Sequence, residues 1–212
     1  MTYPEIAKVL NKKRGIIFDC DGVIIDSRDA NIRFYNLILE RLGMAPMGKE
    51  AEEYVHSHTV FESIRYIVPD QIYQKAIEIG KAISYKEVIP YIKLQKGIKG
   101  VLEKFIKNGK KCAINTNRTS TMPLILSTFS LENFFDPVVT AEVVNNPKPH
   151  PESIFYILNR WNLSPEDVIF IGDSKVDEQT AHNASIDFIS YKNENLSGIF
   201  NITSFEELKK YL

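Results

Sequence analysis

Short apolar segments alternate with amphipathic helical patterns along most of this chain. Each segment is only a few residues long and rich in β-branched side chains, as expected of strands that are covered on both faces. The segments are residues 15–19, 111–116, 137–140, 168–172 and 187–191. Strands that alternate with helices favour a parallel, doubly wound α/β sheet, whose ligand crevice lies beyond the carboxyl ends of the strands. We therefore predict a Rossmann-like core with a five-stranded sheet.

The alternation is interrupted once, between the first and second predicted strands. Residues 28–94 contain no good strand but carry helical stripes, one of which is formed by Ile72, Ala76, Ile79 and Ile83. This segment is too long for a single crossover helix, so we expect an all-helical cap domain that covers the crevice. The core domain would then consist of residues 1–27 and 95–212. Extra helices packed flat against the sheet are the alternative.

Charge and composition exclude several classes of partner. Lys and Arg total 26 against 27 Asp and Glu, and the net charge of -1 gives no long-range field for nucleic acid or anionic membranes. The basic triplet at residues 12–14 is interpreted as a solvated approach to the first strand. Cys20 and Cys112 lie in strand-like segments, which argues against a disulfide framework and favours a cytoplasmic protein. We see no signal-type segment and no run of about 20 apolar residues.

Two acidic residues end the first predicted strand. Alternation along a strand points Asp19 and Asp21 to the same side. Neighbouring carboxylates repel each other unless a cation lies between them or one holds a proton. One of them could attack phosphorus while the other protonates a leaving alcohol and later deprotonates water. Gly22 would permit a sharp turn and present its amide to phosphate oxygens.

The end of the fourth predicted strand adds two more acids. Asp173 leaves the strand, and Asp177 follows one helical turn later. Four acids at one edge of the sheet with little compensating charge predict a hard cation, for which Mg²⁺ is the best candidate.

Groups that suit a phosphate follow two other strands. Thr116 and Asn117 offer a hydroxyl and amides beside the start of a helix. Lys148 lies in a loop stiffened by Pro147 and Pro149, where its ammonium could neutralise the attacking carboxylate and bind phosphate oxygen.

Four motifs in this order resemble those of the haloacid dehalogenase superfamily, in its phosphoglycolate-phosphatase-like branch with a helical cap. The first motif begins at Asp19, the second is Thr116-Asn117, the third begins at Lys148, and the fourth runs over residues 172–177. The resemblance implies a magnesium-dependent phosphatase that forms an aspartyl phosphate and acts on a small phosphorylated metabolite.

The resemblance also implies a role for each matching residue. Asp19 would be nucleophile and metal ligand, and Asp21 would be general acid and base with its main-chain carbonyl on the metal. Thr116 and Lys148 would hold phosphate. Asp173 would bind magnesium, with Asp177 behind it.

Other functions stay open at this point. A phosphomutase of the β-phosphoglucomutase type uses the same core, and a catalytically silent binding module could retain the fold. Arg118 could reach the substrate or cap the surface, and residues 1–14 precede the first strand without an assigned role.

Overall fold

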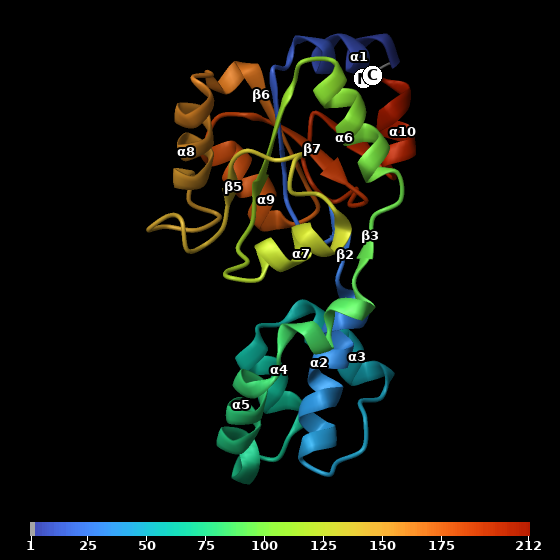
Figure 1. Cartoon of the computed structure of the whole chain (residues 1–212), viewed down its shortest axis with the longest axis vertical. Coiled ribbons are helices and arrows are strands. Elements are labelled where there is room, and N and C mark those ends of the chain that lie inside the picture. Colours follow the sequence, from blue (N-terminus) through green and yellow to red (C-terminus); the bar gives the residue numbers. More distant parts are fainter. Residues whose placement is uncertain (1–2) are drawn as a thin grey trace. The chain divides into compact units, whose positions relative to one another are not determined.

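The computed structural model describes residues 3–212 (Figure 1). The chain forms two compact units, each with its own hydrophobic core. One unit holds the chain up to Ile25 together with Leu94–Leu212, and the other is Asp26–Lys93. Within residues 3–212, no helix combines the length and apolar character needed to cross a membrane.

The first unit is built on a parallel sheet with the strand order β5-β4-β1-β6-β7-β8. Its strands are β1 (Gly15–Phe18), β4 (Lys111–Asn115), β5 (Val138–Val139), β6 (Val168–Gly172), β7 (Asp187–Tyr191) and β8 (Phe200–Ile202). The predicted α/β fold is therefore confirmed, but five strands is wrong for the described residues, because β8 is a sixth. This three-residue strand has Asn201 at its centre, so its sequence lacks the continuous apolar run that identified the others.

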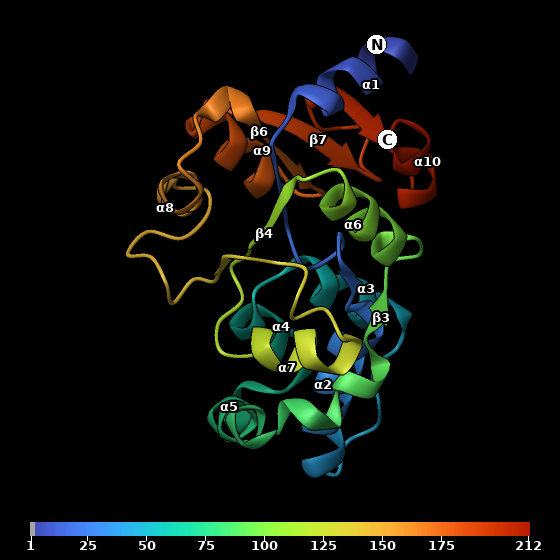
Figure 2. The same ribbon diagram turned by 45° about the horizontal axis from the view of Figure 1, so that its top comes forward.

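Helices cover both faces of the sheet (Figures 1 and 2). They are α8 (Glu152–Trp161) and α9 (Lys175–Asn183) on one face, and α6 (Ile98–Lys107) and α10 (Phe205–Lys210) on the other. Consecutive residues of β1 serve the two faces, as strand alternation requires. Ile17 is buried in the cluster that includes α8 and α9. Phe18 lies 6.3 Å from the ring of Phe105 in α6 and 6.4 Å from that of Phe205 in α10, measured between ring centroids.

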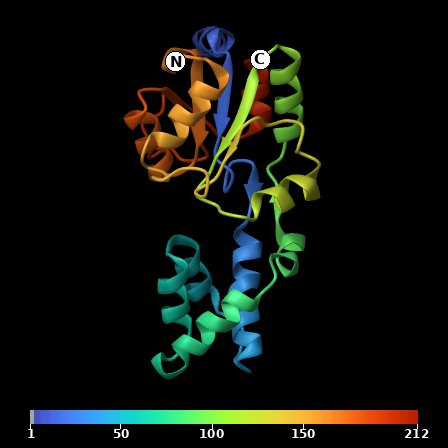
Figure 3. The same ribbon diagram turned by 60° about the vertical axis from the view of Figure 1, so that its left-hand side comes forward.

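The second unit is helical, as predicted for this segment (Figure 3). Its helices are α2 (Arg28–Arg41), α3 (Lys49–Ser57), α4 (Val60–Ile67) and α5 (Tyr73–Ala82), with 3-10 turns η1 (Asp70–Ile72), η2 (Tyr85–Glu87) and η3 (Ile89–Tyr91). Short strands β2 (Ile25–Asp26) and β3 (Lys93–Leu94) pair where the chain enters and leaves it. Buried side chains from α2, α4 and α5, among them Ile38, Ile64 and Ala76, form its core. The insert therefore has a core of its own.

Helix α1 (Tyr3–Lys12) precedes β1. The interpretation of the following basic triplet as solvated is wrong for Lys13, whose side chain is 6% exposed. Its ammonium lies 2.7 Å from a carboxylate oxygen of Asp187 and 2.7 Å from the main-chain oxygen of Glu166. Lys110 donates to the main-chain oxygen of Leu10 at the end of α1. The contacts of these two lysines connect α1 and the residue after it to the edge of the sheet where the strands begin.

Candidate active site

Three polar residues follow the carboxyl ends of three adjacent strands. Asp19 comes directly after β1, Thr116 after β4 and Asp173 after β6. Because β1 lies between β4 and β6 in a parallel sheet, these residues meet at one edge at the centre of the sheet. The main-chain N–H of Asp19 donates to the carbonyl of Ile171 at 2.9 Å, which extends the pairing of β1 and β6 to the aspartate itself.

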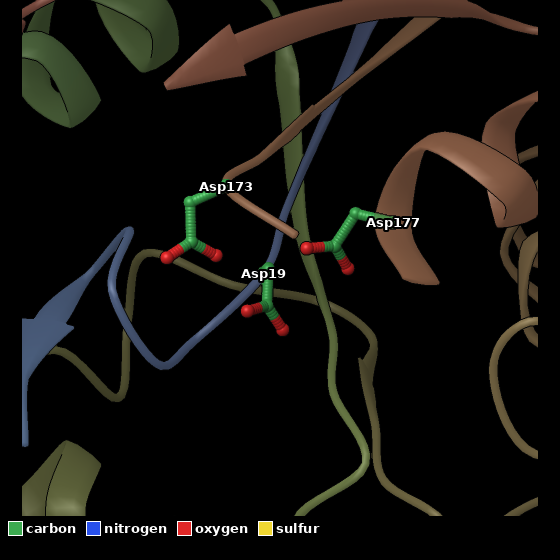
Figure 4. A group of neighbouring side chains, drawn as sticks. All are labelled: Asp19, Asp173 and Asp177. Carbon is green, nitrogen blue, oxygen red and sulfur yellow. The ribbon is translucent and has the colours of Figure 1, made fainter. Parts of the chain in front are cut away.

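Three carboxylates converge at this edge (Figure 4). One oxygen of each of Asp19, Asp173 and Asp177 lies within 4.8 Å of the others. Asp177 is brought there by the first turn of α9, where Ser174 caps the helix. The carboxylate of Asp177 accepts hydrogen bonds from the N–H of Ser174 at 3.1 Å and from its hydroxyl at 2.5 Å. The capping pair therefore orients an acid toward Asp19.

Lys148 lies between two of these carboxylates. Its Nζ is 2.7 Å from Oδ1 of Asp19 and 2.6 Å from Oδ1 of Asp177, and its side chain is 5% exposed. Burial opposes the charged ammonium, but the two carboxylates outweigh that effect and raise the pKa of Lys148. The predicted contact between this lysine and the strand-end aspartate is present.

Asn117 fixes the main chain of Lys148. Its carboxamide donates to the carbonyl of Lys148 at 3.0 Å and accepts from the N–H of Lys148 at 3.0 Å. This two-way contact satisfies both main-chain groups in a turn outside the helices and strands. Asn117, predicted to contribute to phosphate binding, thus has its side chain engaged with the lysine loop, and a phosphate contact of its main-chain N–H stays a prediction.

The acids at this edge are held in an environment that disfavours their charge. Burial raises the pKa of Asp19 to about 8, although the ammonium of Lys148 acts in the opposite direction. Burial also raises the pKa of Asp173 to about 7, and the carboxylate of Asp177 adds to the shift. Lys148 supplies one positive charge to three carboxylates. An additional cation would stabilise the ionised cluster.

The donor set fits a magnesium ion. All the converging ligand atoms are carboxylate oxygens, which bind hard divalent cations in preference to softer metals. Asp177 is already bound to Lys148 and Ser174. Asp19 and Asp173 are therefore the side chains best placed to hold the ion.

Asp21 lies outside the three-carboxylate cluster and pairs with an arginine. Nε of Arg118 is 2.6 Å from Oδ2 of Asp21, and Nη2 is 2.6 Å from Oδ1. The side chains of Arg118 and Asp21 are 15% and 40% exposed. Arg118, whose role the sequence left undecided, thus contacts a predicted site residue.

Gly22 lies against the carboxylate of Asp173. Its φ of 77° is in the left-handed region that favours glycine, and a Cβ built there would collide with that carboxylate. Gln95 donates to the carbonyl of Gly22 at 2.9 Å, and Asn193 donates to the carbonyl of Asp173 at 2.8 Å. Sequence patterns gave no signal for these two contacts, because they join side chains to the main chain of distant segments.

Comparisons with known proteins agree with this geometry. Residues 16–191 match the family model for haloacid dehalogenase-like hydrolases. The chain belongs to this family. The phosphorylated carbohydrates phosphatase of Thermotoga maritima is 30% identical over 186 residues, which cover 82% of both chains. The phosphoglycolate phosphatase of Rhodobacter capsulatus is 27% identical, covering 83% of both.

A solved structure extends the likeness over nearly the whole chain. It is a HAD-superfamily hydrolase of subfamily IA, variant 1, from Geobacter sulfurreducens, with a TM-score of 0.88 and 31% identity, covering 94% of this chain and 96% of its own. The resemblance to the phosphoglycolate-phosphatase-like branch is confirmed, and with it the prediction of a phosphatase of this family.

Proposed function

We propose that this member of the family hydrolyses a small phosphate monoester in a magnesium-dependent reaction in which Asp19 accepts the phosphoryl group. The observation that carries the proposal is the placement of Asp19. Its carboxylate is buried at a strand end, in contact with Lys148 and within 4.8 Å of a carboxylate oxygen of Asp173. A buried carboxylate beside a fixed cation is a suitable nucleophile for phosphorus.

The neighbouring residues divide the remaining tasks. Lys148 compensates the charge of Asp19 and of the bound phosphate. The hydroxyl of Thr116 and the main-chain N–H group of Asn117 hold phosphate oxygens. The N–H of Gly22, predicted to face the phosphate, instead donates to the carbonyl of Ile25 at 2.8 Å. Asp21 gives a proton to the departing alcohol oxygen and later takes one from the attacking water.

Asp19 and Asp173, with the main-chain carbonyl of Asp21, are the proposed magnesium ligands. When bound, Mg²⁺ would supply positive charge that offsets the charge of the phosphate. Asp177 acts behind these ligands by holding Lys148, which it contacts at 2.6 Å.

We further propose residues 1–27 and 95–212 as the catalytic core and residues 28–94 as the cap that excludes water from the bound substrate. The names of the relatives support a small phosphorylated carbohydrate or carboxylic acid as substrate. The free, buried thiols of Cys20 and Cys112 support a reducing compartment, the cytoplasm.

The proposal is tested with p-nitrophenyl phosphate, an aryl substrate that needs no specific cap contacts. Asp19→Asn should lower kcat by more than about a thousandfold in the presence of Mg²⁺, because the amide is a poor nucleophile. The matched control Asp136→Asn changes an exposed aspartate paired with Arg160 and should retain full activity. Removing divalent cations with a chelator should abolish turnover, and adding Mg²⁺ should restore it. Full activity of the Asp19 variant, or turnover that is indifferent to the chelator, would contradict the proposal.

A further inference from the structure

The contact between Arg118 and Asp21 joins two different strand ends. Arg118 lies in the loop after β4, whereas Asp21 lies in the loop after β1. Both carboxylate oxygens of Asp21 are engaged, each at 2.6 Å and each by a different nitrogen of the guanidinium. A bidentate contact of this kind fixes the position of the carboxylate and also the plane in which it lies.

Arg118 is itself held at two points. Its main-chain N–H donates to the hydroxyl of Thr116 at 3.1 Å. Its Nη1 lies 3.3 Å from the hydroxyl of Thr121, directly before helix α7 (Met122–Phe129). The guanidinium is thus aimed by the loop that also carries the proposed phosphate hydroxyl. An ion pair between two fully exposed side chains contributes little free energy. The Arg118 side chain is only 15% exposed, so its contact with Asp21 is screened less by solvent.

We infer that Arg118 is a positioning residue that holds the carboxylate of Asp21 in the orientation needed for proton transfer to the leaving oxygen. The inference rests on the proposed function, in which Asp21 handles that proton. As the bond between phosphorus and the alcohol oxygen breaks, this oxygen takes a proton from Asp21 while the oxygen of Asp19 bonds to phosphorus. In the second half of the reaction, Asp21 takes a proton from water, whose oxygen bonds to phosphorus as the bond to Asp19 breaks.

Arg118 exchanges no proton in this sequence. An oxygen of Asp21 that carries the proton keeps a second lone-pair site for the guanidinium, so both contacts persist. The side chain therefore stays in place through both half-reactions, where a single hydrogen bond would let it rotate. Lysine at position 118 would retain the charge but could not form the planar two-point contact.

The leaving group distinguishes this role from a general structural one. A nitrophenolate departs readily without a proton, whereas phenolate departs more slowly and benefits more from an acid. Phenyl phosphate and p-nitrophenyl phosphate are nearly equal in size, so a difference between them reports proton transfer rather than fit. The value of kcat/KM is the quantity to compare, because it covers the steps through departure of the alcohol.

The experiment measures kcat/KM of both substrates with the full chain, Arg118→Met and Arg118→Lys in Mg²⁺. Both variants should lose about tenfold more kcat/KM on phenyl phosphate than on p-nitrophenyl phosphate. An equal loss on both substrates would assign Arg118 to general structure or substrate binding and overturn the inference. If Arg118→Lys keeps the ratio of the unsubstituted protein, the charge alone would be sufficient, and the role given to the two-point contact would be overturned.

Further variants keep the result interpretable. Asp21→Asn sets the largest ratio that loss of the acid produces. Thr121→Val removes only the hydroxyl that contacts Nη1 and should shift the ratio in the same direction by a smaller factor, which provides a reading if Arg118→Met fails to fold. An unchanged ratio in a folded Thr121→Val protein would then count against the inference. Asp19→Asn should be inactive on both substrates. Activity of that variant would refute the proposed function itself, independently of the ratio.

Discussion

Replacing Lys148 with methionine tests the electrostatics of the site through stability. The substitution keeps an unbranched side chain of similar length but removes the ammonium that lies 2.7 Å from Asp19 and 2.6 Å from Asp177. The side chains of the two acids are 9% and 0% exposed, so they would be left as buried carboxylates without their cation. Breaking a buried ion pair in this way costs about 3–5 kcal/mol.

The cost should depend on pH in a defined direction. Burial already raises the pKa of Asp19 to about 8, and loss of the lysine would raise it further. At acidic pH this carboxyl takes up a proton, which relieves part of the penalty. Without Mg²⁺, Lys148→Met should therefore lower the free energy of unfolding by about 3–5 kcal/mol near about pH 9.5, where Asp19 of the unsubstituted protein is ionised, and by clearly less near about pH 5.5, where Asp19 is protonated in both proteins.

Urea denaturation at both pH values provides the measurement. The matched control is Lys175→Met, which removes a lysine that is 66% exposed and pairs with Glu178 within the same helix. Because the ammonium of Lys175 stays exposed to solvent, its pair with Glu178 should contribute less than about 1 kcal/mol at either pH. Equal costs for the two variants, or a Lys148 cost that does not diminish with acid, would refute the buried-pair reasoning.

Three further predictions concern the loops around the cluster. Gly22→Ala should lower kcat by at least about tenfold, because its Cβ displaces the carboxylate of Asp173 and its φ of 77° strains an alanine. Asn117→Ala should lower the unfolding free energy by about 1–3 kcal/mol and also lower kcat, because both main-chain groups of Lys148 lose their partner. The pKa values of Asp19 and Asp173, about 8 and about 7, exceed the ordinary value of 3.8, so each acid stabilises the folded protein when it is protonated. Without Mg²⁺, the free energy of unfolding should therefore fall as pH rises from about 4 to about 8.

Each of these predictions has a control. Gly43→Ala introduces an alanine at a similar φ of 73° with no atom within 4 Å, and should leave kcat unchanged. Asn133→Ala removes an exposed carboxamide at the opposite end of β4 and should change neither quantity. The pH dependence is read from thermal unfolding, where Asp173→Asn should flatten the decline and Mg²⁺ should reduce it. If the stability of the metal-free protein instead rises with pH, and rises more than that of Asp173→Asn, the raised pKa assigned to these acids would be contradicted.

Much of the fold could be predicted from the sequence because its signals are local. A strand buried on both faces is mostly apolar, so β1, β4, β6 and β7 are visible as short hydrophobic runs. Strand β8 was missed because a short edge strand is defined by main-chain bonds to β7, which its side chains do not encode. The burial of Lys13 was missed for a related reason, since its partners Asp187 and Glu166 come from distant segments.

The same division holds at the candidate site. Placement of Asp19, Thr116 and Asp173 follows from strand ends that share one edge of a parallel sheet, a rule that needs only the order of elements. The pairing of Asp21 with Arg118 and the hold of Asn117 on Lys148 depend on how two loops approach each other. Such contacts are set by tertiary structure, and no spacing rule reports them.

The residue that carries the phosphoryl group during turnover can be identified by trapping the covalent intermediate. The protein is mixed with phosphate-labelled substrate and Mg²⁺, quenched in acid during turnover, and digested with pepsin at acidic pH, because an aspartyl phosphate hydrolyses at the pH that trypsin requires. We predict that the label is found on peptides that contain Asp19, that fragmentation places it on this residue, and that Asp19→Asn yields no label. Label on any other residue, or rapid product formation in a single turnover with no labelled peptide, would show that Asp19 does not accept the phosphoryl group.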